Sequence, residues 1–474
     1  MRTAVLGGRF AALSSSALLG VIAGIGIGAM TGWSGGEVFA SAALLVYLGV
    51  EAPKVGLFGR TVLGIALAVA AAAVAVLPHP ARTVIHGLGE AASLAGLFAA
   101  VGFLREAAES SRLVRDCGIL MVNQPPGRRY LVLTLGSQLI SVVLNFGVLP
   151  LLGTMVMGAN SAEAAGGDLR IVAIRQQRMM TALLRGFAVM TVWSPLSVSF
   201  AVTQSVVHDV PWERLLPQQI VLAFLLMVLG WHLDRVAFDR APPRSCAPAG
   251  GWGPLVRLGL LIGAVVAAAV AVAVVLGVPV VTSTVLAVPA AALVWLAVQH
   301  RRQGVAGAVA AAGELLARRL RVSLPGFRNE IALLGGAMFL GSVASALIAP
   351  ELAAGRLAML GVPPVVLAIL LAWSVMGLAR FGVPQILTVS LLGGAFADPG
   401  RPGPDSLVLA SGLMGAWALS ACTTPVGAAI LSVSRLSGVP MQTIARDWNG
   451  RFVRLGGLLL GLWMLCLHGI FGTG

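Results

Sequence analysis

Long apolar runs constrain this chain more than any other feature. Stretches of about 20 residues follow one another, and short segments that carry most of the arginines separate them. Of the 474 residues, 58% are hydrophobic and 11% are charged, whereas a soluble domain has roughly 25% charged residues. A membrane-spanning helix needs about 20 mostly apolar residues, so the chain is predicted to be an all-α polytopic membrane protein with about 11 transmembrane helices.

The basic residues follow the pattern that sets membrane topology. The net charge is +14, and the arginines concentrate in short loops between apolar runs. Cytoplasmic loops of membrane proteins carry such an excess of positive charge. We therefore expect a lipid bilayer around this chain and no nucleic-acid partner.

The four cysteines are scattered and form no recognisable motif. No C-x-x-C spacing occurs, and no histidine cluster lies near any of them, so no disulfide framework, metal site or resident cofactor is predicted. We interpret them as helix-packing residues: Cys117, Cys246, Cys422 and Cys466.

Nine apolar runs are uninterrupted and are predicted to cross the membrane as single helices. They cover residues 10–33, 38–50, 61–77, 83–104, 218–233, 254–276, 279–298, 331–349 and 452–470. Two further segments, residues 105–129 and 300–327, are amphipathic and rich in arginine. We expect the second of these to lie at the membrane interface.

Two long apolar runs, residues 179–207 and 407–437, contain a proline near the middle. A proline inside a helix removes a hydrogen bond, and irregular backbone at membrane depth is tolerated only where it is buried in protein or lines a cavity. The interruptions lie at Ser194–Ser197 and Thr423–Gly427. Thr424 has the character of an N-cap and Pro425 that of a first helical residue. Each run is therefore predicted to form two half-helices that meet near the middle of the membrane.

Two other apolar runs are interrupted in a different way. Residues 130–157 break at Asn145–Pro150 and residues 363–394 break at Ala379–Pro384, which predicts two re-entrant hairpins. Asn145–Val148 matches Arg380–Val383 at an offset of 235 (380 minus 145), and the two proline breaks match at an offset of 230 (425 minus 195). Both halves have the order span, polar connection, hairpin, broken helix and span, so we infer an internal duplication.

The two halves are predicted to be inverted relative to each other. Corresponding spans are five crossings apart, and the arginine-rich loops then all fall on one side. This places the N-terminus in the cytoplasm and the C-terminus outside, in a bacterial inner membrane. The predicted organisation is scaffold helices over 1–82, a first repeat over 83–233, a cytoplasmic linker over 234–253, scaffold and interfacial helices over 254–328, and a second repeat over 329–474.

Inverted repeats with discontinuous helices are typical of secondary transporters. Helix N-termini at the breaks favour an anion, because they present free N–H groups and a positive dipole end. Arg380 is the most informative residue, since a charge at membrane depth is costly and marks a transport pathway. No acidic residue is expected at the same depth. The predicted substrate-binding residues are Asn145, Gly147, Ser194, Ser197, Arg380, Gly382, Thr423, Thr424 and Pro425.

Other interpretations remain open at this point. Each proline break can be a kink without a ligand, and Arg380 can form a structural ion pair or cap hairpin carbonyls. A cation/proton antiporter is the alternative within transport. A polytopic membrane enzyme is disfavoured, because no cluster of His, Asp and Glu or nucleophile–base pair is present at an interface.

The hairpin with Asn145 at its tip and the motif Ala421–Ile430 resemble the ion transporter superfamily, which includes divalent anion:sodium symporters and arsenite permease relatives. The resemblance runs from about Gly87 to the C-terminus. It implies a small-anion transporter, with a carboxylate or dicarboxylate as substrate and Na+ or H+ as coupling ion. It also implies a scaffold domain, a mobile transport domain, a homodimer and elevator-type alternating access.

The chain departs from the hairpin motif of that superfamily, which is Ser-Asn-Thr. Leu144 and Phe146 flank Asn145, and Ala379, Arg380 and Phe381 replace the whole triplet in the second hairpin. The resemblance leaves Asn145, Ser194 and Thr423 as sodium-site candidates. We hypothesise that the Arg380 guanidinium takes the place of a bound cation and pairs with the anionic substrate, which favours exchange or proton coupling over sodium coupling.

Overall fold

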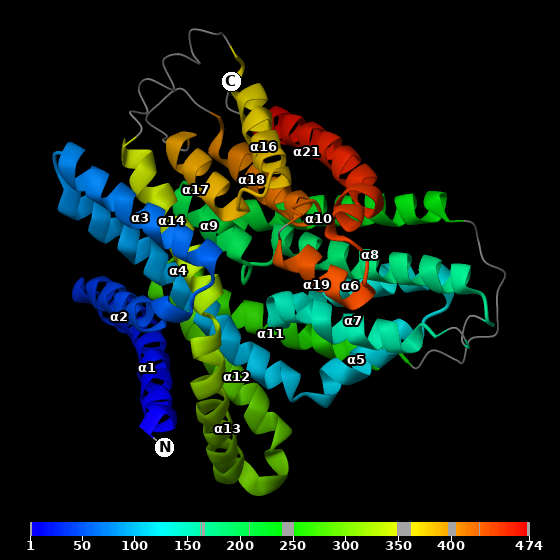
Figure 1. Cartoon of the computed structure of the whole chain (residues 1–474), viewed down its shortest axis with the longest axis horizontal. Helices are drawn as coiled ribbons and strands as arrows, with labels where there is room; N and C mark the ends of the chain where they lie inside the picture. Colours follow the sequence, from blue (N-terminus) through cyan, green and yellow to red (C-terminus); the bar gives the residue numbers. More distant parts are fainter. Residues whose placement is uncertain are drawn as a thin grey trace. The chain divides into compact units, whose positions relative to one another are not determined.

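The structure is a computed structural model that describes residues 2–161, 163, 166–207, 209–238, 251–347, 362–396, 404–425 and 427–471. The chain is all-helical over these residues and contains no strand there (Figure 1). Eleven helices in the described part are long and apolar enough to cross a membrane. An all-α polytopic membrane fold is therefore confirmed.

Each predicted uninterrupted span corresponds to one helix. Residues 348 and 349 of the span 331–349 and residues 239–250 of the linker lie outside the described residues. The helices are α1 (Arg2–Thr31), α2 (Gly35–Glu51), α3 (Leu57–Val76), α4 (Pro80–Glu109), α10 (Trp212–Ala237), α11 (Gly253–Leu276), α12 (Val280–Gln299), α14 (Arg328–Leu347) and α21 (Gly450–Phe471).

The two predicted hairpins are interrupted where expected. The first consists of α6 (Pro126–Leu144) and α7 (Val148–Ala159), and the second of α16 (Pro364–Arg380) and α17 (Gln385–Phe396). The eleven candidate spans include the first hairpin, which counts as one span. They do not include the second broken helix, because each of its halves is too short. Our sequence count reached the same number from a different set. The re-entrant nature of both hairpins and the membrane side from which each enters stay predictions.

Both proline-containing runs are broken into two helices. The first gives α8 (Leu169–Trp193) and α9 (Val198–Val206), and the second gives α18 (Ser406–Ala421) and α19 (Ala428–Ser437). The prediction that the first run begins at residue 179 is wrong, because α8 starts ten residues earlier (179 minus 169). The Asp168 carboxylate accepts hydrogen bonds from the backbone N–H groups of Arg170 and Ile171 and so caps the helix there.

The amphipathic segments are helical as well. Residues 105–129 divide among the end of α4, the helix α5 (Arg112–Val122) and the start of α6. Residues 300–327 form a short 3₁₀ turn and the helix α13 (Gly304–Gly326). Interfacial placement of α13 stays a prediction.

The contacts group the chain into two compact units. Unit 1 comprises residues 1–110, 263–359 and 389–398, and unit 2 comprises residues 111–262, 360–388 and 399–474. In unit 1, α4 packs against α1, α2, α12 and α14. The first helix of each predicted repeat, α4 or α14, therefore groups with the predicted scaffold helices, while the predicted domain boundaries themselves stay a prediction.

Unit 2 is built around α8, which packs against α6, α7, α10 and α18. Every residue of α8 from Met179 to Val192 is buried. Gly186 lets α6 approach closely, since a Cβ atom there would lie 2.5 Å from the Thr134 carbonyl oxygen and 2.7 Å from the Ser137 Cβ. The Ser137 hydroxyl also donates a hydrogen bond to the Leu183 carbonyl at 2.8 Å. The two predicted repeats contact each other in this unit, because α7 packs on α19 and α9 packs on α18.

Candidate functional site

The second hairpin turns directly after Arg380. Helix α16 ends at this residue, and the chain turns through Phe381–Pro384 before α17 begins at Gln385. Gly382 has φ +89, a left-handed backbone conformation that glycine adopts without steric cost. The tip thus places Arg380 at the end of a helix, with Phe381 strongly exposed beside it.

The second helix break is wider than the sequence indicated. Helix α19 begins at Ala428 with Gly427 as its N-cap, so the prediction that Thr424 caps it and Pro425 starts it is wrong. The Thr424 hydroxyl is engaged elsewhere: it donates to the Ser420 carbonyl at 2.8 Å and accepts from the Gln385 side-chain amide at 3.1 Å. The latter bond joins the second hairpin to the second break.

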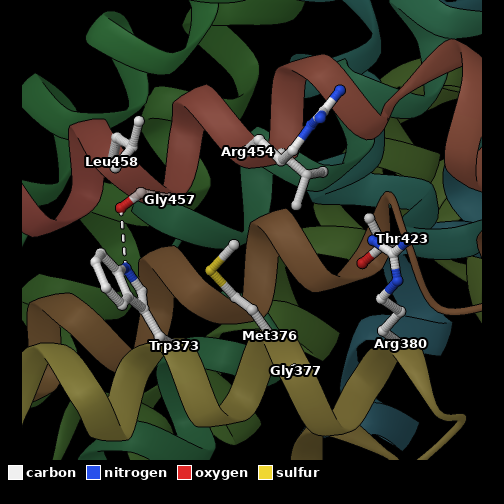
Figure 2. Close-up of a pocket in the computed structure, with 9 residues that line it drawn as sticks. Trp373, Met376, Gly377, Arg380, Thr423, Arg454, Gly457 and Leu458 are labelled. Carbon is white, nitrogen blue, oxygen red and sulfur yellow. Dashed lines mark hydrogen bonds between the residues drawn. The ribbon is translucent and has the colours of Figure 1, made fainter.

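Arg380 and Thr423 line one cavity of about 410 Å³ in unit 2 (Figure 2). Figure 2 shows the Arg380 guanidinium turned toward Thr423 and the Arg454 guanidinium pointing away from α16. No acidic residue is among the described residues that line it. The lining residues are Trp373, Met376, Gly377, Arg380, Thr423, Val453, Arg454, Gly457 and Leu458.

The cavity lies near one end of α21. Arg454, the fifth residue of α21, shares the cavity with Arg380. Arg380 is also exposed, and α16 is 17 residues long. The sequence predicts a charge at membrane depth. The structure shows that Arg380 lies beside the first turns of the last candidate span, and its depth in the membrane stays a prediction.

The tip of the first hairpin has a different construction. Asn145 ends α6 with φ +49, the one non-glycine residue with a positive φ in the described chain. The next residue, Phe146, packs its ring on Phe187 of α8 with the centroids 4.9 Å apart. Asn145 and Gly147 are half-buried, and neither lines the cavity of Figure 2.

At the first helix break, the serine hydroxyl groups form hydrogen bonds with nearby backbone N–H groups. The Ser197 hydroxyl caps α9 by accepting from the Phe200 N–H at 3.2 Å, and the Ser194 hydroxyl accepts from the Leu196 N–H at 3.3 Å. Both serines are buried, and neither lines the cavity of Figure 2. The structure thus brings together the second hairpin and the second break, while convergence of all four interruptions stays a prediction.

The three sodium-site candidates also have local roles. Ser194 accepts from its own turn, and the Thr423 hydroxyl donates to the Ser420 carbonyl at 3.3 Å. Asn145 holds the left-handed turn of its hairpin. In the described part of the chain, no three His, Cys, Asp or Glu side chains lie together where they could hold a metal ion.

Sequence reasoning missed a buried arginine in α8. The Arg185 guanidinium donates to Asn449 Oδ1 at 3.0 Å, the Tyr130 hydroxyl at 3.2 Å, and the carbonyls of Gly230 and Trp448 at 3.4 and 2.9 Å. It also stacks on a phenylalanine ring, 4.6 Å from the centroid of Phe452.

All the hydrogen-bond acceptors of Arg185 are neutral, so its charge is stabilised by dipoles and an aromatic face instead of a carboxylate. The signal in the sequence is an arginine inside the apolar run 179–193, seven residues after Arg178. Arg178 itself forms an ion pair with Asp234 at 2.6 Å, two turns before Arg185.

The described cysteines give no sign of reactive chemistry. Cys117 and Cys422 are buried, Cys466 is exposed, and Cys246 lies outside the described residues. Burial, together with the smaller effect of the neighbouring Asp116 carboxylate, raises the pKa of the Cys117 thiol to about 12. Cys117 is therefore a packing residue of α5.

Comparison with known proteins finds structural relatives and no sequence relative. No family model and no curated protein matches the chain. The fold is similar to the crystal structure of the YdaH transporter of Alcanivorax borkumensis, with a TM-score of 0.53 and 17% sequence identity. The match covers 82% of this chain and 90% of that one. The chain therefore has the fold of a membrane transporter.

Proposed function

We propose that the protein is a secondary active transporter for a small anion, most simply a carboxylate or dicarboxylate, in a bacterial inner membrane. Membership of the ion transporter superfamily is part of this proposal. The transporter fold and the paired interruptions in the two halves support it, because discontinuous helices are where such transporters bind substrates and ions.

One observation carries the choice of an anion. The cavity of Figure 2 joins the second hairpin to the second break, and its charged lining residues, Arg380 and Arg454, are both positive. An arginine presents several donors in a planar fork that matches a carboxylate. The Thr423 hydroxyl adds a neutral partner at the inner end of the same cavity.

Alternating access of elevator type, in a homodimer, is the mechanism we propose. The grouping of contacts into two units supports it, because unit 2 holds both broken helices, the first hairpin and helix α16 of the second hairpin. Arg380 would supply the positive charge that a bound cation supplies in sodium-coupled relatives. Exchange or proton coupling is therefore favoured over sodium coupling.

The test is uptake by the purified protein in liposomes. A thermal-shift screen against small anions, with and without sodium, first identifies ligands, since a ligand stabilises the folded state by mass action. Uptake of the best anion should then fall at least about tenfold in Arg380→Ala, the cost of one charge-assisted pair. Arg451→Ala is the matched control. Arg451 is an exposed arginine of α21, the helix that carries Arg454, but it does not line the cavity.

Unchanged rate and affinity in Arg380→Ala would overturn the proposed role of Arg380. Flux that follows a sodium or proton gradient with no anion requirement would instead establish a cation/proton antiporter. Chemical turnover without flux across the membrane would establish an enzyme.

A further inference from the structure

The cavity of Figure 2 continues as an apolar groove between α16 and α21. We call it the α16–α21 groove and define it by Trp373, Met376, Gly457 and Leu458, which line the cavity away from Thr423. Trp373 is 41% exposed and Leu458 is 56% exposed. The Trp373 indole N–H donates to the Gly457 carbonyl at 3.0 Å, which fixes the ring as one wall of the groove.

Exposed apolar residues extend the groove along both helices. Leu370 lies one turn before Trp373 and is 48% exposed, and Leu462 lies one turn after Leu458 and is 61% exposed. Helix α21 is one of the candidate membrane spans. The face that carries Leu458 and Leu462 is thus open to the hydrocarbon of the bilayer.

Arg454 lies where phospholipid headgroups lie. Seventeen residues of α21 follow it, from Leu455 to Phe471 (471 minus 454). At 1.5 Å per residue they extend about 25 Å, close to the roughly 30 Å thickness of the hydrocarbon core. Arg454 therefore marks one edge of that core, and the groove runs from it toward the other edge.

The charge at this end of the groove is uncompensated. Arg454 donates from Nε to the Gly450 carbonyl of its own helix at 3.3 Å. Neither Arg454 nor Arg380 has an ion pair with a described residue. Basic pockets between transmembrane helices bind anionic lipid headgroups, and each arginine near the membrane surface adds to the attraction.

We propose that the α16–α21 groove binds one anionic phospholipid. The headgroup phosphate accepts hydrogen bonds from Arg454, whose guanidinium points away from α16, and an acyl chain lies along Trp373 and Leu458. The Arg380 guanidinium faces Thr423 at the inner end of the cavity. It strengthens the positive potential there without being the phosphate ligand, so lipid binding does not depend on the proposed transport function.

The experiment measures lipid binding by the full-length protein in detergent. Native mass spectrometry counts the phosphatidylglycerol molecules that remain bound as the lipid is titrated, with phosphatidylcholine as the neutral lipid. The wild type should retain one phosphatidylglycerol in preference to phosphatidylcholine. Arg454→Ala should lower its affinity about fivefold or more, whereas Arg451→Ala, one turn earlier and outside the groove, should change it less than twofold.

A second variant tests the acyl-chain half of the site. Leu458→Trp fills the groove at an exposed position and should displace the lipid without unfolding the protein, which a thermal-shift measurement checks. Equal losses in Arg454→Ala and Arg451→Ala, equal binding of both lipids, or full retention in Leu458→Trp would each overturn the proposal. Displacement of the lipid by an amphiphilic carboxylate that is itself transported, or by a second copy of the chain, would also overturn it. No transport is measured in the binding titration, so its failure leaves the proposed function standing.

Discussion

Two arginines of unit 2, Arg185 and Arg380, carry the same charge in opposite surroundings. Arg185 is 5% exposed, and its guanidinium donates to four neutral acceptors from other segments of the chain. Arg380 is exposed at the end of α16 and has no ion pair within the described residues. The first arginine is fully committed to the fold, and the second is available to a ligand.

The difference shows that an arginine in an apolar run is not by itself a substrate ligand. Both residues would raise the same expectation from sequence, because a charge within a membrane helix is costly and marks a pathway by default. Only the surroundings separate them. Arg185 connects the chain segments around α8, whereas Arg380 faces a cavity beside Thr423.

The largest effect is expected for Arg185→Ala. Its removal leaves Asn449 Oδ1, the Tyr130 hydroxyl and two buried carbonyls without their donor. Hydrogen bonds to a charged group contribute about 1.5–3 kcal/mol each, so the free energy of unfolding should fall by about 3 kcal/mol or more. Chemical unfolding of the purified protein measures it, with Arg451→Ala as the control. Wild-type stability in Arg185→Ala would show that the network contributes nothing.

Substitution by lysine separates charge from geometry. Lysine keeps the charge but lacks the planar fork. Arg185→Lys should therefore lose about 2 kcal/mol of stability, because one ammonium cannot reach four acceptors. Arg380→Lys should leave stability unchanged and retain part of the uptake that Arg380→Ala loses. If Arg185→Lys and Arg380→Lys changed stability by the same amount, or changed uptake by the same amount, the two arginines would not differ in role.

Tyr130→Phe tests one branch of the Arg185 network. It deletes the hydroxyl that accepts from Arg185 at 3.2 Å and keeps the buried ring. The free energy of unfolding should fall by about 1 kcal/mol. A double-mutant cycle with Arg185→Lys should give a smaller loss than the sum of the two single losses. If the stability losses of the two single variants simply added in the double variant, Arg185 and Tyr130 would not interact.

The smallest effect on stability is expected for Arg380→Ala. An exposed residue without a partner contributes within about 0.5 kcal/mol of zero. Denaturant unfolding should therefore superimpose on that of the wild type, while uptake falls as described above. A loss comparable to that of Arg185→Ala would make Arg380 a structural residue and remove it from the site.

The sequence predicts the spans and interruptions well because their causes are local. Run length determines a spanning helix, and prolines such as Pro195 and Pro425 break the helix where they stand. Helix starts are harder, because capping depends on competing partners. Asp168 extends α8 backward, and Thr424 fails to cap α19 because its hydroxyl bonds Ser420 and Gln385.

The Arg185 network is not predictable from local pattern. Its acceptors Gly230, Tyr130 and Asn449 are 45, 55 and 264 residues away along the chain. No spacing rule connects such positions, and only the folded packing of α8 brings them together. Arg380 could be predicted at a hairpin tip because the break is local, but its position beside Arg454 of α21 could not, because the two residues are far apart along the chain.

The close approach at Gly186 has a mechanical consequence. A side chain at position 186 would collide with the Thr134 carbonyl of α6, and the Ser137 hydroxyl is bonded across the same contact, so the two helices leave no room for even one methyl group between them there. We therefore expect α6 and α8 to move as one piece in any rearrangement of unit 2, because a close contact and a hydrogen bond join them.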